Sequence, residues 1–305
     1  MSAALGDRSD DDQVSLGLVG ALVAVSAWGL SGVIAKHIDM PGLSIGAYRF
    51  LTYGIVVSAL MWVRGTRLSV HVMRASMAGG ISLGFDVALF FSAVKLTSVA
   101  NTTVIGALQP VVVAIVAHRV FGEIVRGRDL MLGAVALAGV IVVVLGGAES
   151  GGTSWTGDAL AAGALFAWAG YFIFSRLSKG VISSNQYTVG AALWVGIVNA
   201  PLALLFGQSL AWPSSSDWAW LLALAFGAGI LGHALMNWSL QQIPLWLGST
   251  TTLFVPVVAA TAAWLFLDEP LNALQIGAMV VVVASLAGVV TGQSSIGNRP
   301  RPLRR

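Results

Sequence analysis

Asp86 is a carboxylate in the middle of a long apolar stretch, in the run GFDV. A charged side chain at membrane depth costs about 2.5–3.5 kcal/mol on insertion scales, so it should face a watery cavity or a partner. There it could carry a coupled proton or bind a cationic amine, or it could be held by a neighbouring helix as a structural group. Because intramembrane acids are functional by default, Asp86 is a candidate proton-coupling and substrate-binding residue.

His233 lies in a second apolar stretch and is followed, at spacings of four, by Asn237 and Gln241. Side chains at this spacing share one face of a helix. The imidazole ring can gain and lose a proton near neutral pH, although a hydrogen bond to a backbone carbonyl in a packed bundle would explain it equally well. The accompanying amide favours a cavity lining. His233 is therefore a second proton-coupling candidate, and His233 and Asn237 are both substrate-binding candidates.

Aromatic and amide side chains complete the candidate binding set. Trp28 and Trp168 lie mid-stretch, and Tyr171 shares a face with Trp168. Aromatic rings can enclose an apolar or cationic molecule, although ordinary packing is as good an explanation. Phe90 lies one helical turn beyond the intramembrane acid, and Gln109 directly precedes a proline. We expect these five side chains to contact a substrate.

Two groups of residues recur about 140 positions apart. The recurring members are Ala27-Trp28 with Lys36, which return as Ala167-Trp168 with Arg176 at an offset of 140, and Pro110 with Glu123, which return as Pro256 with Glu269 at an offset of 146. Internal repeats of this size in a bilayer protein are typical of transporters, which place a site where the halves meet. In this register Asp86 falls opposite Gly232, beside His233, so both groups should lie near the pseudo-two-fold axis. The paired prolines are expected to act as hinges.

The composition is that of a membrane protein. Of its 305 residues 57% are hydrophobic and 10% are charged, with a mean hydropathy of +0.85, whereas a soluble domain is about a quarter charged. The chain has no cysteine, and its four histidines are scattered, so we expect no metal site and no cofactor. Its basic residues lie in loops and the tail, which is a topology signal and does not indicate a nucleic-acid partner. The expected partners are the lipid bilayer and a small-molecule substrate.

Ten apolar segments are long enough to cross a bilayer, which takes about 20 residues. We predict an all-α membrane fold with helices at 14–35, 43–63, 75–94, 98–121, 130–148, 158–177, 186–206, 217–240, 247–267 and 273–291. The predicted domains are a disordered N-terminus (1–13), a first five-helix repeat (14–148), a linker (149–157), a second repeat (158–291) and a basic tail (292–305). Five is odd, so the second repeat is inverted relative to the first.

Lysine and arginine indicate the orientation. With the N-terminus inside, thirteen of them fall on the cytoplasmic side and three on the other, so we predict that both termini are cytoplasmic. The acidic N-terminal segment lacks the basic start of a cleavable signal peptide. Glu123 and Glu269 then lie at opposite sides, where we expect them to cap helices or hold loops. Arg49, near the outer end of its helix, could clamp a carboxylate, but we expect it to snorkel or to pair structurally.

These motifs resemble the EamA-type branch of the drug/metabolite transporter superfamily, over about residues 15–291. Each half has a proline, a glutamate thirteen residues later and a glycine-bearing last helix; the residues are Pro110, Glu123, Gly133 and Gly139, then Pro256, Glu269, Gly277 and Gly288. The first half also carries Tyr48-Arg49-Phe50. The resemblance implies two inverted five-helix repeats and export of amino acids, other metabolites or drugs across the bacterial inner membrane. Ala191-Ala192 replaces Tyr48-Arg49 in the second half, so a role of Arg49 is not duplicated.

The leading hypothesis is a secondary transporter that exports a small metabolite by alternating access, with proton coupling at Asp86 or His233. The sequence has no phosphate-binding loop, so a gradient must supply the energy. The alternatives are a facilitator without proton coupling, a lipid scramblase or membrane enzyme, and a non-transporting receptor. The sequence contains no paired carboxylates and no nucleophile–base set, so it gives no support to an enzyme. Two five-helix halves suffice for function, so either a monomer or a homodimer would serve.

Overall fold

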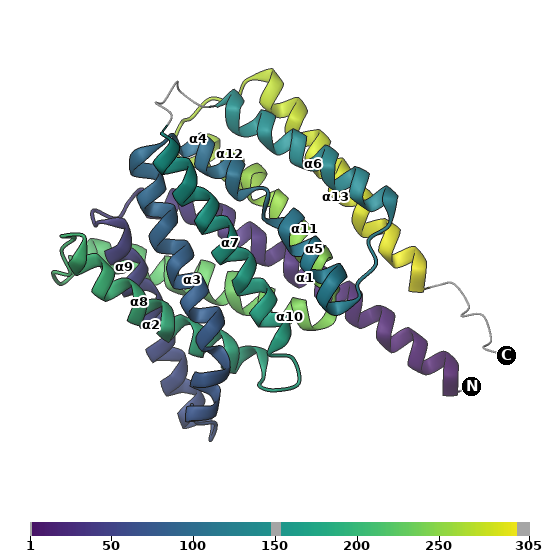
Figure 1. The fold of residues 1–305 in the computed structure, drawn as a ribbon, viewed down its shortest axis with the longest axis horizontal. Coiled ribbons are helices and arrows are strands. Elements are labelled where there is room, and N and C mark those ends of the chain that lie inside the picture. Colours follow the sequence, from purple (N-terminus) through teal and green to yellow (C-terminus); the bar gives the residue numbers. More distant parts are fainter. Residues whose placement is uncertain (1, 148–153, 298–305) are drawn as a thin grey trace.

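The computed structural model is all-helical over the residues that it describes, 2–147 and 154–297 (Figure 1). In chain order the elements are α1 (Ser2–Ala35), α2 (Gly42–Val63), α3 (Val70–Leu96), α4 (Val99–Gly106), α5 (Gln109–Phe121), α6 (Gly127–Gly146), α7 (Trp155–Leu177), α8 (Ser184–Leu205), α9 (Ser215–Leu224), η1 (Ala225–Ala234), α10 (Leu235–Gln242), α11 (Leu245–Thr250), η2 (Thr251–Phe254), α12 (Val255–Phe266) and α13 (Ala273–Gly297). Within the described residues, ten helical segments are long and apolar enough to cross a membrane. The predicted all-α fold with ten spans is confirmed.

The fourth and ninth spans are broken at equivalent places. α4 ends at Gly106 and α5 begins at Gln109, with Pro110 in its first turn. In the ninth span the short 3-10 helix η2 separates α11 from α12, which has Pro256 in its first turn. Proline is tolerated there because first-turn N–H groups have no intrahelical partner. The repeated prolines therefore start new helical segments inside the membrane.

The eighth span contains an irregularity that the sequence does not reveal. Between α9 and α10 the backbone forms a π-helix, η1, over Ala225–Ala234, where we predicted one regular helix. π-helical turns are rare and occur frequently at functional sites. His233 lies at the end of η1. The third span, its repeat counterpart, is the continuous helix α3, so the two repeats differ in the middle of the bundle.

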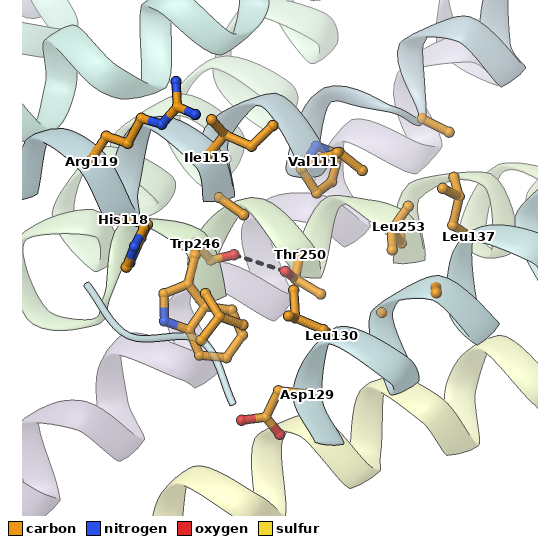
Figure 2. Close-up of a pocket in the computed structure, with 16 residues that line it drawn as sticks. Val111, Ile115, His118, Arg119, Asp129, Leu130, Leu137, Trp246, Thr250 and Leu253 are labelled. Carbon is orange, nitrogen blue, oxygen red and sulfur yellow. Dashed lines mark hydrogen bonds between the residues drawn. The ribbon is translucent and has the colours of Figure 1, made fainter. Parts of the chain in front are cut away.

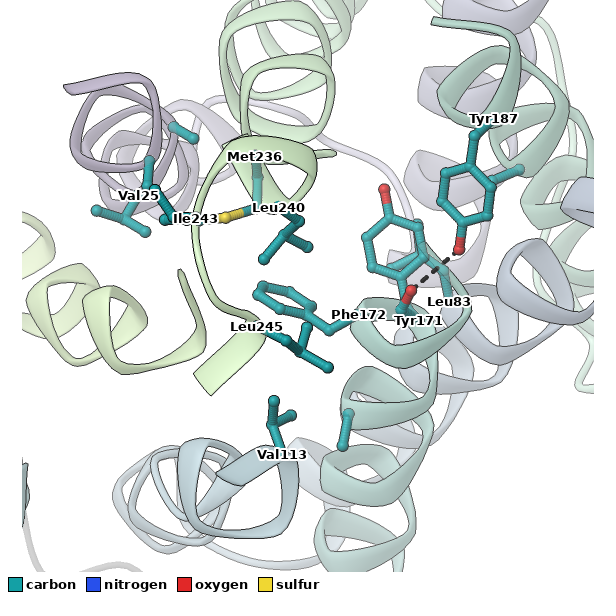
Figure 3. Packing of buried hydrophobic residues seen from close by; sticks show 14 of the residues in the cluster. Val25, Leu83, Val113, Tyr171, Phe172, Tyr187, Met236, Leu240, Ile243 and Leu245 are labelled. Atoms are coloured by element: carbon teal, nitrogen blue, oxygen red, sulfur yellow. Dashed lines mark hydrogen bonds between the residues drawn. The ribbon is translucent and has the colours of Figure 1, made fainter. Parts of the chain in front are cut away.

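Helices of the two halves interleave. α3 packs against α7 and α8, α2 against α8, and α1 against α10, η1 and α12. The approach of α3 to α8 depends on Gly80, where an added Cβ would lie 2.8 Å from the Cα of Ala191. In the main buried cluster, Phe172 of α7 lies between Leu240 and Leu245 of the second half (Figure 3). The final helices of the halves, α6 and α13, run side by side along one edge (Figure 1).

The ends of the chain differ in part from the expectation. α1 begins at Ser2, so helix extends into the segment 1–13 for which we predicted disorder. Once nucleated, a helix gains one hydrogen bond for each residue added, which favours propagation beyond the apolar span. At the other end α13 continues to Gly297. The four arginines of the predicted tail and most of the predicted linker lie outside the described residues.

Candidate functional site

The rings that surround His233 come from three different helices. The centroid of its imidazole lies 5.1 Å from the indole of Trp28 on α1, 5.3 Å from Phe50 on α2 and 5.7 Å from Tyr171 on α7. His233 itself is only 6% exposed. The end of η1 therefore places an ionisable ring in an aromatic enclosure built from both halves of the chain.

Arg49 turns into this enclosure from α2. Its Nη2 lies 3.3 Å from His233 Nε2, and its guanidinium carbon lies 4.7 Å from the centroid of the Phe50 ring. The expected snorkelling to the outer interface is therefore wrong, because the guanidinium finds an acceptor and an aromatic face inside the bundle. Pairing with an acid is not seen either. Among the described residues, no carboxylate forms an ion pair with Arg49.

Trp28 and Trp168, equivalent in the two repeats, meet across the interface of the halves. Their ring centroids are 6.3 Å apart in an edge-to-face arrangement, and both rings also contact Phe172. Both side chains are half-buried. This geometry places the two candidate tryptophans in one cluster with His233, so a ligand that touches one can touch the other.

Asn237 is fully buried and its side chain bonds to three others. Its Nδ2 donates to Tyr171 Oη at 2.6 Å and to Thr188 Oγ1 at 2.8 Å, and its Oδ1 accepts from Ser175 Oγ at 2.8 Å. Tyr171 in turn stacks on Tyr187, whose hydroxyl donates to the Tyr171 carbonyl (Figure 3). The network joins α7, α8 and α10. It favours a structural role for Asn237 that holds the wall of the enclosure.

Asp86 lies elsewhere on the interface of the halves. It shares a stripe of α3 with Ser82 and Leu89, which approach α7 closely at Gly170 and Gly163. The carboxylate is half-buried, and no hydrogen bond or ion pair joins it to His233 in the described part of the chain. One turn further on, Phe90 is 37% exposed and lies edge to face with the adjacent Phe91. Among the described residues, no hydrogen bond, ion pair or ring contact joins either candidate to the aromatic enclosure.

Gln109 occupies the break in the fourth span. Its side chain is fully buried, and both amide atoms lack a hydrogen-bond partner among the described residues. Buried amides are usually paired, so an unpaired one marks a site of rearrangement or binding. The next residue, Pro110, starts the new helical segment. This geometry keeps Gln109 among the candidates.

Two ion pairs close the ends of the bundle, and both join one half to the other. Arg176 Nη2 lies 3.4 Å from Glu123 Oε1, and Lys36 pairs with Glu269. Glu123 also accepts from the backbone N–H groups of Leu245 at 2.9 Å and Trp246 at 3.1 Å, which caps α11. The expected capping role of Glu123 is thus confirmed, but the helix that it caps belongs to the other half.

A cavity of about 610 Å³ lies between α5, α6 and α11 (Figure 2). Its walls are mostly apolar, with Val111 and Ile115 on one side and Leu130 and Leu137 on the other. His118, Arg119 and Asp129 stand at its margin. Of the side chains that we singled out from the sequence, Pro110 lines it. This apolar space is separate from the polar cluster around His233.

Sequence reasoning missed the hydrogen-bond partner of His233 and several side chains that form or hold the enclosure. Arg49 was considered but placed at the interface, and Phe50, Thr188 and Ser175 were not singled out. Their roles come from contacts between residues that lie 49 to 184 positions apart, which no local pattern encodes. One signal in the sequence was available, since Arg49 has no equivalent in the second repeat. A charged residue that is present in only one repeat has a role that the repeat symmetry does not explain.

Comparison with known proteins places these features in context. The family model described as EamA-like transporter family matches residues 15–145 and 155–291. A probable amino-acid metabolite efflux pump of Escherichia coli (strain K12) is 26% identical over 87% of this chain and 92% of its own length. The aromatic amino acid exporter YddG of Ancylobacter novellus is 28% identical over 66% and 70%, respectively. A solved crystal structure with 21% identity superposes with a TM-score of 0.75, over 93% of this chain and 99% of its own, which shows the shared fold.

Proposed function

Because the chain belongs to the EamA-like transporter family, we propose that it exports an amino acid or a related amphipathic metabolite by alternating access. The protein is a multi-pass protein of the bacterial inner membrane, and its relatives bear the names of efflux pumps and exporters. Those names concern amino acids, including threonine and homoserine for RhtA of Salmonella typhimurium. We take both termini to be cytoplasmic, as the charge distribution predicts.

The observation that carries this proposal is the crossed arrangement of the two ion pairs. Glu123 and Glu269 are repeat equivalents, and so are Lys36 and Arg176. Each glutamate pairs with the cation of the other half. The cations end the first and sixth spans, which run in opposite directions, so the pairs lie at opposite ends of the bundle. Such a pattern supports a device in which one end opens while its symmetry mate stays closed.

The two pairs differ in how firmly they hold. The side chains of Glu123 and Arg176 are only 10% and 20% exposed, and Arg176 Nη1 also donates to the Leu240 carbonyl at 2.6 Å. Lys36 and Glu269 are 60% and 53% exposed. An exposed pair contributes about 0–1 kcal/mol, whereas a buried pair is costly to break. We infer that this conformation is closed at the cytoplasmic end and is easier to open at the outer end.

We place the substrate in the enclosure around His233. Trp28, Trp168 and Arg49 supply two half-buried aromatic surfaces and one cation between the halves. An amphipathic metabolite needs that combination, because its apolar part packs on rings while its charged part finds a partner. The helix breaks at Pro110 and Pro256 would let the flanking segments move as this space opens to one side and then the other.

Efflux from proteoliposomes loaded with a pool of labelled amino acids tests the proposal. We expect one chemical class of amino acid to leave these proteoliposomes faster than it leaves loaded liposomes without protein. We expect Trp28→Ala to slow that flux at least about ten-fold, because the indole ring is lost from the site. Leu30→Ala, a change at a 40% exposed position of the same helix, is the matched control. Equal leakage with and without the protein for every compound would refute export of this class. Lipid flipping in the same vesicles would favour a scramblase.

Proton coupling is a second proposal, which concerns His233 and Asp86. The Arg49–His233 hydrogen bond needs a lone pair on Nε2, so a protonated His233 cannot form it. Among the described residues, the titratable groups with a hydrogen bond or ring contact to the imidazole are Arg49 from α2 and Tyr171 from α7. We expect a pH gradient to stimulate flux, and His233→Gln and Asp86→Asn to abolish that stimulation. Stimulation that survives both changes would refute the roles of His233 and Asp86, and flux that does not respond to the gradient at all would leave a facilitator driven by the substrate gradient.

A further inference from the structure

Three N–H donors beside His233 are buried and have no acceptor among the described residues. They are Trp28 Nε1, Arg49 Nε and, on the ring itself, the Nδ1 position of His233. The indole N–H edge of Trp28 lies directly against the Cα of Gly232, the neighbour of His233 in the chain. Buried polar atoms are paired in the great majority of cases, so three unpaired ones in a single cluster call for an explanation.

The contact with Arg49 determines whether His233 Nδ1 is a hydrogen-bond donor or an acceptor. A guanidinium nitrogen can only donate, so in the 3.3 Å contact His233 Nε2 must be the acceptor. A neutral imidazole carries one proton, which must then sit on Nδ1. His233 therefore presents an N–H, and the unpaired atoms of the cluster are all donors.

A site made only of donors and one cation selects an anion. No carboxylate of the described chain forms an ion pair with Arg49, and His233 offers no free lone pair. Charge-assisted hydrogen bonds from guanidinium and ring N–H groups to a carboxylate are the strong pairings of this type. We propose that Trp28, Arg49 and His233 form a carboxylate-binding site, in which the carboxylate of the exported molecule completes the unpaired donors.

The surroundings define the rest of the ligand. Trp28 and Trp168 are both half-buried and lie edge to face, so the space next to the donors is apolar and aromatic. The second half has Ala191-Ala192 at the positions of Tyr48-Arg49, so the anion site exists once and the ligand binds in one orientation. This inference rests on the proposed export function, because it names the group by which the exported molecule is held.

Three probes that share a phenyl group distinguish the contributions of the carboxylate and the amine of such a ligand. L-phenylalanine carries a carboxylate and an amine, 3-phenylpropanoate carries only the carboxylate, and phenethylamine only the amine. Purified protein in nanodiscs is titrated with each, and the shift of the unfolding temperature is measured. We expect both carboxylates to stabilise the protein, and phenethylamine not to. Arg49→Met should weaken the binding of both carboxylate probes at least about ten-fold, whereas Arg64→Gln, outside the cluster, should leave their binding unchanged.

Trp28→Phe covers the case in which Arg49→Met does not fold, since it keeps an aromatic ring, although a smaller one, and removes the N–H donor. We expect Trp28→Phe to weaken the binding of 3-phenylpropanoate several-fold. Stabilisation by phenethylamine alone, or carboxylate binding unchanged in Arg49→Met and Trp28→Phe, would overturn the site. Efflux measured in parallel separates the two proposals. Carboxylate binding without any flux refutes export and leaves the site standing, whereas flux without carboxylate dependence refutes the site and leaves export standing.

Discussion

Removing Glu123 should open the predicted cytoplasmic end of the bundle. The Glu123 carboxylate caps α11 through the N–H groups of Leu245 and Trp246, and it holds Arg176 from the other half. Glu123→Ala deletes all three contacts at once. The remaining bonds from Arg176, to the Leu240 and Ile243 carbonyls, lie within the second half and cannot keep the halves together.

The contacts give the expected size of the effect. Loss of a helix cap costs about 0.5–2 kcal/mol. Breaking a fully buried ion pair costs about 3–5 kcal/mol and an exposed one about 0–1 kcal/mol, so a pair that is 10% and 20% exposed lies between them, at about 1–3 kcal/mol. The total is about 1.5–5 kcal/mol, which shifts the closed–open equilibrium by about 10- to 4,000-fold. The symmetry-related Glu269→Ala, at an exposed pair, should cost no more than about 1 kcal/mol.

The chain has no cysteine, so one introduced thiol reports the opening directly. Ser178 is 5% exposed and lies two residues from Arg176, which makes Ser178→Cys a buried probe at this end. We would measure its labelling rate by an impermeant maleimide in inside-out vesicles. Glu123→Ala should raise the rate more than about ten-fold, with Glu269→Ala as the matched control. An unchanged rate, or an equal rise in the control, would refute the assignment of the Glu123–Arg176 pair as the closing contact.

Three further predictions follow from single residues. Asn237→Ala should destabilise the protein by about 2–4 kcal/mol, because it removes the partner of the buried Tyr171 and Ser175 hydroxyls, whereas Thr188 still donates to the Ser184 carbonyl. Thermal unfolding in detergent would measure the loss, and an unchanged midpoint would contradict the network. Gly80→Ala should lower the yield of folded protein, because its Cβ would meet the backbone of α8, whereas Gly133→Ala has open space and should not; size-exclusion profiles compare them. Pro110→Ala and Pro256→Ala should each reduce flux several-fold with little change in unfolding temperature, and normal flux in both would refute the hinges.

Much of the architecture was predictable from local patterns. The ten spans follow from apolar length alone, because a bilayer leaves a backbone no alternative to internal hydrogen bonding. Pro110 and Pro256 predicted breaks, and the structure has new helical segments beginning at both. The repeat also made Trp28 and Trp168 equivalent positions of the two halves, and the structure places their ring centroids 6.3 Å apart. Each of these is a property of a residue and its neighbours in the chain, or of symmetry.

The candidate site was only partly predictable. Intramembrane charge pointed to Asp86 and His233, but the structure joins His233 to Arg49 and gives Asp86 no direct link to the cluster among the described residues. The π-helix η1, which carries His233, has no signature in composition or hydropathy. Asn237 was expected beside a cavity, but it is fully buried and its side chain bonds to three residues of α7 and α8.

By itself, then, the sequence determined the membrane class, the ten spans, the duplication and the family, because each depends on hydrophobic length or on self-similarity along the chain. Only the tertiary structure decided which polar groups meet. Glu123 finds Arg176 and Glu269 finds Lys36 across the two halves, and Arg49 bonds to His233 over 184 positions. In an apolar interior most buried polar groups are paired, and the partner is selected by how the helices cross, which no single stretch of sequence specifies.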